Sequence, residues 1–259
     1  MNQGLYISAM GAATSMHRQD IHANNLANVN TVGFKPLLAA VRQRDVARVE
    51  DGLFHLPSND LLERLGGGVQ AMPERVNFAQ GSIEVTGNNR DVAIQGEGFL
   101  MVRDSTHGDS TSTRLTRDGR LTRNAQGFLV LATTGQPVLD SGNGPIRIPD
   151  EAPVKIDADG TITQDGRAIG RLALVSVPNL ERVERLGNGL FNADASTLDA
   201  RRPATGRLVQ NAVERSAMNE IDAIMNVTGA GRDAQANITM ISFHDRIMDQ
   251  AINRLGRVS

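Results

Sequence analysis

The sequence predicts an α+β protein in which long N- and C-terminal α-helices pair as a coiled coil and the central part of the chain forms an antiparallel all-β domain. Three observations predict this fold. Apolar residues recur at helical spacing near both ends, no proline interrupts the C-terminal run, and short alternating runs separated by turn residues fill the middle. With 259 residues, the chain is long enough for one large or two medium domains with a real core.

The C-terminal segment, from about Ala217 to Val258, carries a long apolar stripe. Read from Ile224 in alternating steps of three and four, eight of ten positions are apolar. Apolar residues that repeat every seven positions lie on one side of a helix and favour left-handed supercoiling against another helix. Gly229, Gly231 and Asp245 interrupt this segment, and there we expect the helix to bend, break or meet a neighbour closely.

The N-terminal segment has a matching heptad pattern from Leu5 to Leu26. Six of its seven core positions are apolar, and several are alanines, which permit close helix approach. The pattern stops in residues 28–33, where asparagine and glycine tolerate the left-handed backbone that ends helices, and Pro36 prevents the helix from resuming.

The two stripes predict the surface along which the helices pack, within one molecule or between molecules. Burial of an aliphatic side chain contributes about 1.5–3 kcal/mol, so we expect these stripes to be buried against another helix rather than left in water. An intramolecular core is the open alternative for every position, and both can hold at once. The expected assembly contacts are Leu5, Ala9, Ala12, Met16, Ile224, Ile238, Ile241, Met248 and Leu255.

The changes in sequence texture divide the chain into four parts. Residues 1–36 are the N-terminal helix of a terminal helical domain, and 208–259 are its C-terminal helix. Residues 37–80 form a connecting segment of mixed structure punctuated by glycine and proline. Residues 81–207 form the central β domain, with strands at roughly ten-residue spacing. Within it, Asp118-Gly119 indicates a hairpin with a two-residue turn.

Composition excludes several classes of function. The formal charge of −2 argues against nucleic acid as a partner, since neutralising phosphates needs clustered cations, and the only local cluster is Arg201, Arg202 and Arg207. The chain has no cysteine, which excludes disulfides and thiolate chemistry. No run of eighteen apolar residues predicts a membrane span, and the first twenty residues lack the cationic and apolar regions of a secretory signal peptide.

No constellation predicts catalysis, a cofactor or a metal site. Asp157 and Asp159 invite a calcium interpretation, but Ile162 replaces the loop glycine and Ala168 replaces the final acid. The five histidines are dispersed, and no nucleophile elbow or phosphate-binding loop is present. Two other classes stay open: a secreted adhesin or calcium-binding surface protein, which leaves the heptads unexplained, and a hydrolase with distant carboxylates.

A specific motif spans residues 24–35, which read N-N-L-A-N-V-N-T-V-G-F-K. It resembles the N-terminal signature of the bacterial flagellar rod and hook family, N-N-L-A-N-x-x-T-x-G-[FY]-[KR]. Residues 81–99 and 116–127 resemble further family patches in the same order, so the resemblance covers most of the chain. We expect the motif to fix a helix end and a turn rather than to bind a ligand. Its key positions are Asn24, Asn25, Leu26, Ala27, Asn28, Gly33 and Phe34.

The resemblance implies a structural subunit of the basal-body rod, the axial drive shaft that transmits torque to the hook. Its partners would be other flagellar rod and hook subunits, copies of itself in a helical assembly, and the flagellar type III export apparatus. Its place would be the periplasmic part of the basal body, reached without a cleaved signal peptide. Length and central-domain size resemble the proximal (F-type) or distal (G-type) rod proteins, and the start, MNQGLY, and the ending favour the proximal type.

Overall fold

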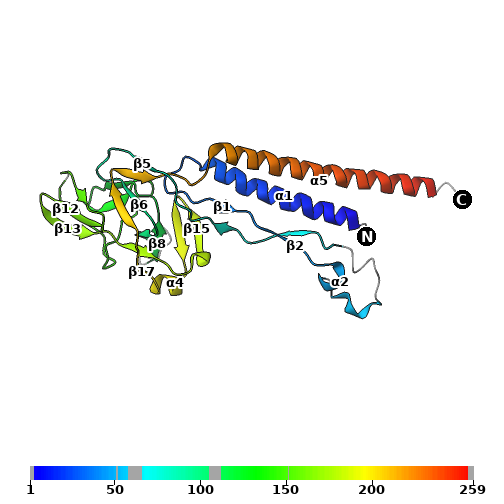
Figure 1. Ribbon diagram of the computed structural model, residues 1–259, viewed down its shortest axis with the longest axis horizontal. Coiled ribbons are helices and arrows are strands. Elements are labelled where there is room, and N and C mark those ends of the chain that lie inside the picture. The colour runs from blue at the N-terminus through cyan, green and yellow to red at the C-terminus, as the bar shows by residue number, and fades with distance from the viewer. Residues whose placement is uncertain (1–2, 51, 58–65, 105–111, 151, 256–259) are drawn as a thin grey trace. The chain divides into compact units, whose positions relative to one another are not determined.

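The computed structural model describes residues 3–50, 52–57, 66–104, 112–150 and 152–255 (Figure 1). The chain divides into two compact units. We call Met1–Ala27, Leu37–Arg75 and Asn219–Ser259 the helical unit, and Asn28–Pro36 and Val76–Met218 the β unit. The predicted α+β class is confirmed, with terminal helices and a mostly antiparallel β domain.

The helical unit is built on two helices, α1 (Gln3–Ala27) and α5 (Glu220–Leu255), which lie side by side (Figure 1). Residues between them in sequence also pack on α1, through β1 (Leu37–Leu38) and β3 (Val69–Ala71). The remaining elements of this segment are β2 (Val41–Gln43), which pairs antiparallel with β3, α2 (Ala47–Glu50), a 3₁₀ turn η1 (Leu53–His55) and β4 (Arg75–Val76).

Helix α5 begins and continues for identifiable reasons. The Asn219 side chain accepts a hydrogen bond from the Ile221 N–H at 2.9 Å, and Glu220 and Asp222 place negative charge at the positive end of the helix. The predicted break at Gly229, Gly231 or Asp245 is wrong, because α5 runs without interruption to Leu255. A close neighbour is found at Gly231, where an added Cβ would lie 3.4 Å from Gln19 Nε2. Among the described residues, no helix is long and apolar enough to cross a membrane.

The β unit contains a six-stranded antiparallel sheet and several smaller ones. The large sheet has the order β15 (Val183–Gly187), β16 (Leu190–Ala193), β8 (Ser112–Thr116), β7 (Phe99–Asp104), β14 (Leu174–Ser176) and β17 (Arg202–Pro203). One smaller sheet has three strands, β11 (Lys155–Ile156), β12 (Thr161–Gln164) and β13 (Arg167–Arg171). The others are two-stranded. They pair β9 (Leu121–Arg123) with β10 (Leu129–Leu131), β6 (Val92–Gln95) with β18 (Arg207–Gln210), and β5 (Ile83–Val85) with β19 (Ala212–Glu214). Two short helical pieces complete the unit, η2 (Leu180–Arg182) and α4 (Ala195–Asp199).

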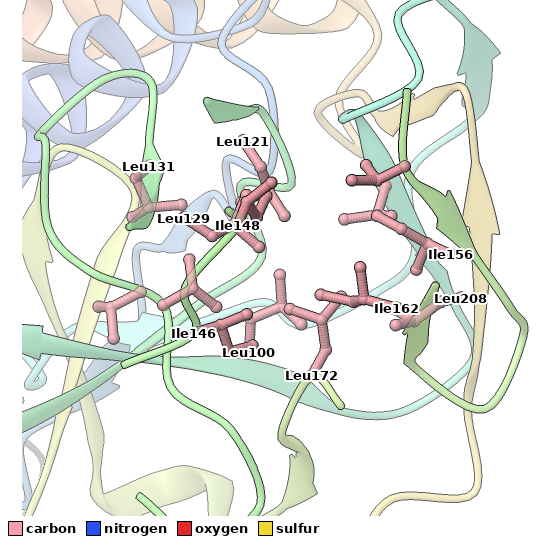
Figure 2. Close-up of a cluster of buried hydrophobic side chains, with 14 of the residues drawn as sticks. Leu100, Leu121, Leu129, Leu131, Ile146, Ile148, Ile156, Ile162, Leu172 and Leu208 are labelled. Atoms are coloured by element: carbon pink, nitrogen blue, oxygen red, sulfur yellow. The ribbon is translucent and has the colours of Figure 1, made fainter. Parts of the chain in front are cut away.

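The core of the β unit is mainly aliphatic. Leucine, isoleucine and valine from β6, β7, β10, β12 and the segments between them form one cluster, shown in Figure 2. A second cluster contains Phe99 and Phe191, which pack with Phe78 at ring-centroid distances of 5.4 and 5.5 Å. With aromatic residues at 3% of the chain, interdigitated branched aliphatic side chains must supply most of the buried area.

The hairpin predicted at Asp118-Gly119 is wrong. Strand β8 pairs with β7 and β16, whereas β9 pairs with β10. The Asp118 side chain accepts the Arg120 N–H at 3.1 Å, and the Gly119 carbonyl accepts the Val92 N–H at 2.9 Å. These bonds hold residues 117–120 as a connector between two sheets, and they let the Arg117 side chain turn into the interior.

Candidate assembly site

Helices α1 and α5 pack through small residues. An added Cβ at Gly4 would lie 2.7 Å from His244 Cε1, and one at Gly11 would lie 2.5 Å from Asn237 Oδ1. The buried residues of α5 include three alanines, Ala223, Ala230 and Ala234, and those of α1 include Ser8, Ala12 and Ser15. Side chains of this size let two helix backbones approach closely. We call this contact the α1–α5 seam.

The nine expected assembly residues lie mostly beside the seam rather than in it. Ala12 is buried, and Ile238 and Ile241 are half-buried. Leu5, Ala9, Met16, Ile224 and Met248 are exposed. Leu255 ends α5, and its side chain lies outside the described residues.

The residues of the seam keep the predicted spacing, but several of them lie one position earlier in the chain than the residues that the pattern selected. On α1 it uses Gly4 and Gly11 where the pattern selected Leu5 and Ala12, although Ala12 is also buried. On α5 it uses Ala223 where the pattern selected Ile224. The small residues therefore lie in the seam, and the large apolar side chains next to them stay exposed on the surface of the single chain.

A second apolar face of α5 is exposed. Ile221, Met225, Met240, Phe243 and Ile247 belong to it, with exposed fractions from 46% for Ile247 to 67% for Ile221. Phe243 follows Ile221 by 22 positions and Ile247 follows Met225 by 22, and 22 residues make about six helical turns, so each pair lies on the same side of the helix. The seven-residue pattern did not identify this face, and Arg232, midway between Ile221 and Phe243, interrupts an apolar repeat of eleven.

The C-terminal end of α5 extends beyond the beginning of α1. Gly4, one residue after the first described residue of α1, lies against His244, so the residues after His244 continue past this contact. Met248 and Ile252 are exposed there, and both fall on the seam side of the helix by their spacing from Ala234 and Ile241. The extension is a further uncovered apolar strip.

The family-motif residues in the helical unit fasten the chain that follows α1. The Asn25 amide donates to the Leu37 carbonyl at 2.8 Å and accepts from the Leu37 N–H at 2.9 Å, and the side chain is buried. Asn24 and Ala27 are exposed, and Leu26 is half-buried. Asn25 thus satisfies both backbone groups of the residue that begins β1.

The motif residues in the β unit build a turn. The Asn28 carbonyl accepts the Thr31 N–H at 3.0 Å, and Gly33 has φ +69°, where an added Cβ would lie 2.5 Å from the Asp118 nitrogen. Phe34 is buried, with the Arg185 guanidinium 4.8 Å from its ring centroid. These positions serve conformation and packing.

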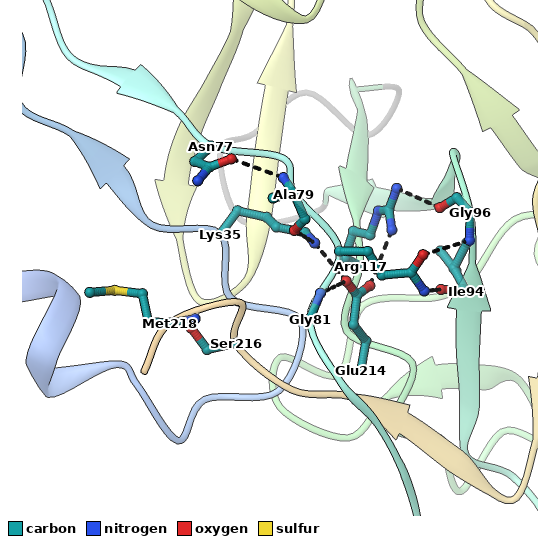
Figure 3. Close-up of polar contacts among 11 residues, drawn as sticks. Lys35, Asn77, Ala79, Gly81, Ile94, Gly96, Arg117, Glu214, Ser216 and Met218 are labelled. Atoms are coloured by element: carbon teal, nitrogen blue, oxygen red, sulfur yellow. Dashed lines mark hydrogen bonds and ion pairs between the residues drawn. The ribbon is translucent and has the colours of Figure 1, made fainter. Parts of the chain in front are cut away.

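A buried ion cluster is built around Lys35, the last residue of the motif, and it was not predicted from the sequence (Figure 3). Lys35 Nζ lies 2.6 Å from Glu214 Oε1 and donates to the Ala79 carbonyl at 2.7 Å. Arg117 reaches Glu214 Oε2 at 3.2 Å and donates to the Gly96 carbonyl at 3.1 Å. Burial lowers the pKa of Lys35, against the opposing effect of Glu214. The signal in the sequence was the lysine that ends the motif.

The acidic turn considered for calcium is occupied by internal partners. Asp157 pairs with Lys155 at 2.8 Å. Asp159 accepts the Thr161 N–H and hydroxyl at 3.0 and 2.9 Å, and these hydrogen bonds lower its pKa. Within the described part of the chain, no group of three or more histidine, aspartate and glutamate side chains could hold a metal ion.

Two family models match the chain. Residues 5–35 match "Flagella basal body rod protein", and residues 93–164 match "Flagellar hook protein FlgE/F/G D1 domain". The first match spans most of α1 and the motif turn, and the second lies in the β unit.

Curated relatives match over essentially the whole length. The flagellar basal-body rod protein FlgF of Caulobacter vibrioides is 32% identical, with 100% of each chain covered. FlgF of Escherichia coli is 31% identical with 95% of each chain covered, and the flagellar basal-body rod protein FlgG of Bacillus subtilis is 26% identical with 98% of this chain and 99% of the relative covered. The motif turn, the paired terminal helices and these full-length relatives agree, and the chain belongs to the flagellar basal-body rod protein family.

Proposed function

We propose that this chain is a structural subunit of the flagellar basal-body rod, the axial drive shaft that transmits torque to the hook. It assembles with copies of itself and with other rod and hook subunits through surfaces of α1 and α5 that are uncovered in the single chain. Within residues 1–36 and 208–259, helices α1 and α5 act together in this assembly. Residues 81–207 form the β domain together with β18 and β19, and residues 37–80 connect the two parts. The proposal includes no catalytic activity and no cofactor.

The observation that carries the proposal is the density of exposed large apolar side chains on α5. Met225 is 66% exposed, Phe243 51% and Ile252 66%, and all lie within one 36-residue helix. Met225 and Phe243 belong to the exposed face, and Ile252 lies on the seam side beyond the start of α1. Large exposed apolar side chains gathered on one element of a folded chain mark an interaction site. Each such side chain contributes about 1.5–3 kcal/mol when a neighbouring subunit covers it.

Within one subunit, α1 and α5 pair as a coiled coil. Support comes from the spacing of the seam on α5, where Ala223, Val227, Ala230, Ala234, Asn237, Ile241 and His244 alternate in steps of four and three. This is the repeat of a left-handed pair. The seam positions are small or half-buried, and the flanking assembly residues Leu5, Met16, Ile224 and Met248 then face neighbouring subunits.

The subunit lies in the periplasmic part of the basal body and arrives through the flagellar type III export apparatus without a cleaved signal peptide. Of the two rod types, we favour the proximal one, because the two relatives above at more than 30% identity are both FlgF proteins. The intact mass of the protein recovered from purified basal bodies tests the export route. A mass that lacks an N-terminal segment would contradict it.

Substitution of Phe243→Glu in the full-length protein tests the assembly proposal. We expect cells with this variant as their only copy to lack flagella, while the purified monomer keeps its helical circular dichroism, since Phe243 is exposed. The matched control is Val85→Glu, which introduces the same charge at a site that is 77% exposed on β5. Normal incorporation of Phe243→Glu into basal bodies would contradict the proposal.

The alternative of a secreted adhesin or calcium-binding surface protein gains nothing from the relatives above, which are named rod proteins. A motility assay distinguishes the rod hypothesis from the adhesin hypothesis. Loss of this protein leaves cells without flagella if it is a rod subunit, whereas loss of an adhesin leaves swimming intact.

A further inference from the structure

A cavity in the β unit is independent of the helical assembly surfaces. Its volume is about 590 Å³, within the range of small-ligand pockets. The segment Arg201–Arg207, which includes the outermost strand β17, forms one wall, and β14 with Asp159 and Arg171 forms much of the rest. Strand β17 is an edge of the six-stranded sheet (Figure 1).

The cavity is strongly cationic. Arg171, Arg201, Arg202 and Arg207 line it against a single carboxylate, Asp159, a net of four minus one, or three positive charges, in a chain whose formal charge is −2. Asp159 already accepts two hydrogen bonds from Thr161 and lies 3.6 Å from Arg171. It is therefore engaged within the turn.

The four arginines differ in their side-chain hydrogen bonds and ion pairs. Arg201 donates to the Leu198 carbonyl at 2.8 Å and to Asn143 Oδ1 at 3.3 Å, which fixes its position. By contrast, the exposed side chains of Arg202 and Arg207 make no hydrogen bond or ion pair with any residue that the structure describes. An exposed guanidinium group beside a cavity can donate two parallel hydrogen bonds, and their geometry matches the two oxygens of a carboxylate.

Most of the rest of the lining is apolar, with Ser141 and Thr205 as polar exceptions, and none of the lining residues is aromatic. Met101, Leu172 and Val175 contribute to it, together with Pro203 and Ala204. Without a ring on which a base could stack, the cavity does not suit a nucleotide. An aliphatic side chain fits such a surface, and neighbouring carboxylates would meet the arginines.

Backbone pairing is a weak means of recognition at this edge. Strand β17 contains Pro203, which has no N–H to donate, and the Ala204 N–H is already bonded to the Leu174 carbonyl at 3.1 Å. Side chains must therefore supply the specificity. We propose that this cavity, the arginine pocket, binds a short acidic peptide segment of a partner protein, with carboxylates on Arg202 and Arg207 and an aliphatic side chain against Met101.

Titration of the full-length protein with two peptides tests the proposal. The probe is acetyl-Leu-Glu-Glu-Leu-amide, and its neutral match is acetyl-Leu-Gln-Gln-Leu-amide. We expect only the acidic peptide to bind, with an affinity that falls as salt is added. The Met101 methyl resonance, assigned through Met101→Leu, should shift on binding because Met101 lines the cavity.

The variant Arg202→Gln/Arg207→Gln should lose affinity by about tenfold for each arginine, since a charge-assisted hydrogen bond is stronger than a neutral one. The control, Arg147→Gln/Arg167→Gln, removes the same charge from two exposed arginines of the β unit outside the cavity and should bind as the wild type does. Equal loss in both variants, or binding that leaves the Met101 resonance unmoved, would overturn the proposal. Equally tight binding of inorganic sulfate would instead identify a general anion site. Self-association that depends on concentration and is lost in Arg202→Gln/Arg207→Gln would identify a second copy of this chain as the occupant. Either result overturns the assignment to a partner peptide.

Discussion

Lys35 and Glu214, 179 positions apart in the chain, form an ion pair at 2.6 Å in which neither side chain has any exposed surface. Glu214 also meets Arg117 at 3.2 Å and accepts the Gly81 N–H at 3.0 Å. One carboxylate thus joins the motif turn, the start of the β unit and the connector after β8. Removal of either charge of a buried pair leaves the other uncompensated.

Substitution of Glu214→Gln should destabilise the protein by about 3–5 kcal/mol, because two buried cations then lose their counterion. Lys35→Met should lower the free energy of unfolding by less than Glu214→Gln does, since Arg117 still neutralises Glu214. Urea unfolding of both variants measures the two free energies. A larger loss in Lys35→Met than in Glu214→Gln would show that the carboxylate is not the centre of the cluster.

Asn25→Ala should lower the free energy of unfolding by about 1–3 kcal/mol, since it leaves a part-buried donor and a part-buried acceptor of Leu37 without their side-chain partner. Hydrogen exchange at the Leu37 amide should accelerate with it. Asn30→Ala is a control, because Asn30 is exposed in the motif turn and should tolerate the change. Unchanged protection of Leu37 in Asn25→Ala would refute the role assigned to this motif residue.

Gly11 and Gly229 offer a comparison of two helical glycines. Gly11 lies against Asn237, whereas an added Cβ at Gly229 meets nothing within 4 Å. Gly229→Ala should therefore raise helix stability by about 0.5–1 kcal/mol, the usual difference between the two residues. Gly11→Leu should lower it by forcing the seam apart. Thermal unfolding followed by far-ultraviolet circular dichroism distinguishes the two, and equal effects would contradict the close seam.

Asp194 gives the protein a pH-dependent cap on α4. Its carboxylate accepts the Thr197 N–H at 3.0 Å and the Ser196 hydroxyl at 2.8 Å, and these hydrogen bonds lower its pKa below the ordinary value of 3.8 for an aspartate. Between the folded pKa and 3.8 the unfolded chain binds more protons, so the stabilisation is complete above 3.8 and is lost as pH falls through the folded pKa. Asp194→Ala should be less stable than wild type at neutral pH, and the difference should vanish in strong acid. A difference that persists unchanged in strong acid would contradict this assignment.

The terminal helices could be predicted from the sequence, because apolar spacing reports a helix whatever it packs against. The face in contact could not, since Ile224 looks like a better core residue than Ala223 in isolation. Only the partner helix decides between them, and Gly4 and Gly11 on α1 favour close approach over large side chains. The alternating runs between turn residues similarly predicted the β domain but not which of its strands pair.

The motif illustrates a second limit. Asn25 and Gly33 were expected to fix a helix end and a turn, and their hydrogen bonds and φ angle explain how such positions act. The buried ion pair of Lys35 was not predicted, because nothing in the neighbouring sequence signals a carboxylate 179 residues away. Long-range pairing of charges cannot be read from spacing along one chain.

Photo-cross-linking in isolated basal bodies tests the central claim, that the exposed apolar face of α5 contacts neighbouring subunits. A benzophenone side chain in place of Phe243 lies on this face and can bond to a C–H group of any chain that covers it, because Phe243 is exposed. The same side chain in place of Val85, which is 77% exposed on β5, is the control. We predict cross-linked subunits from position 243 and few or none from position 85. Cross-linking from position 85 alone would contradict the claim.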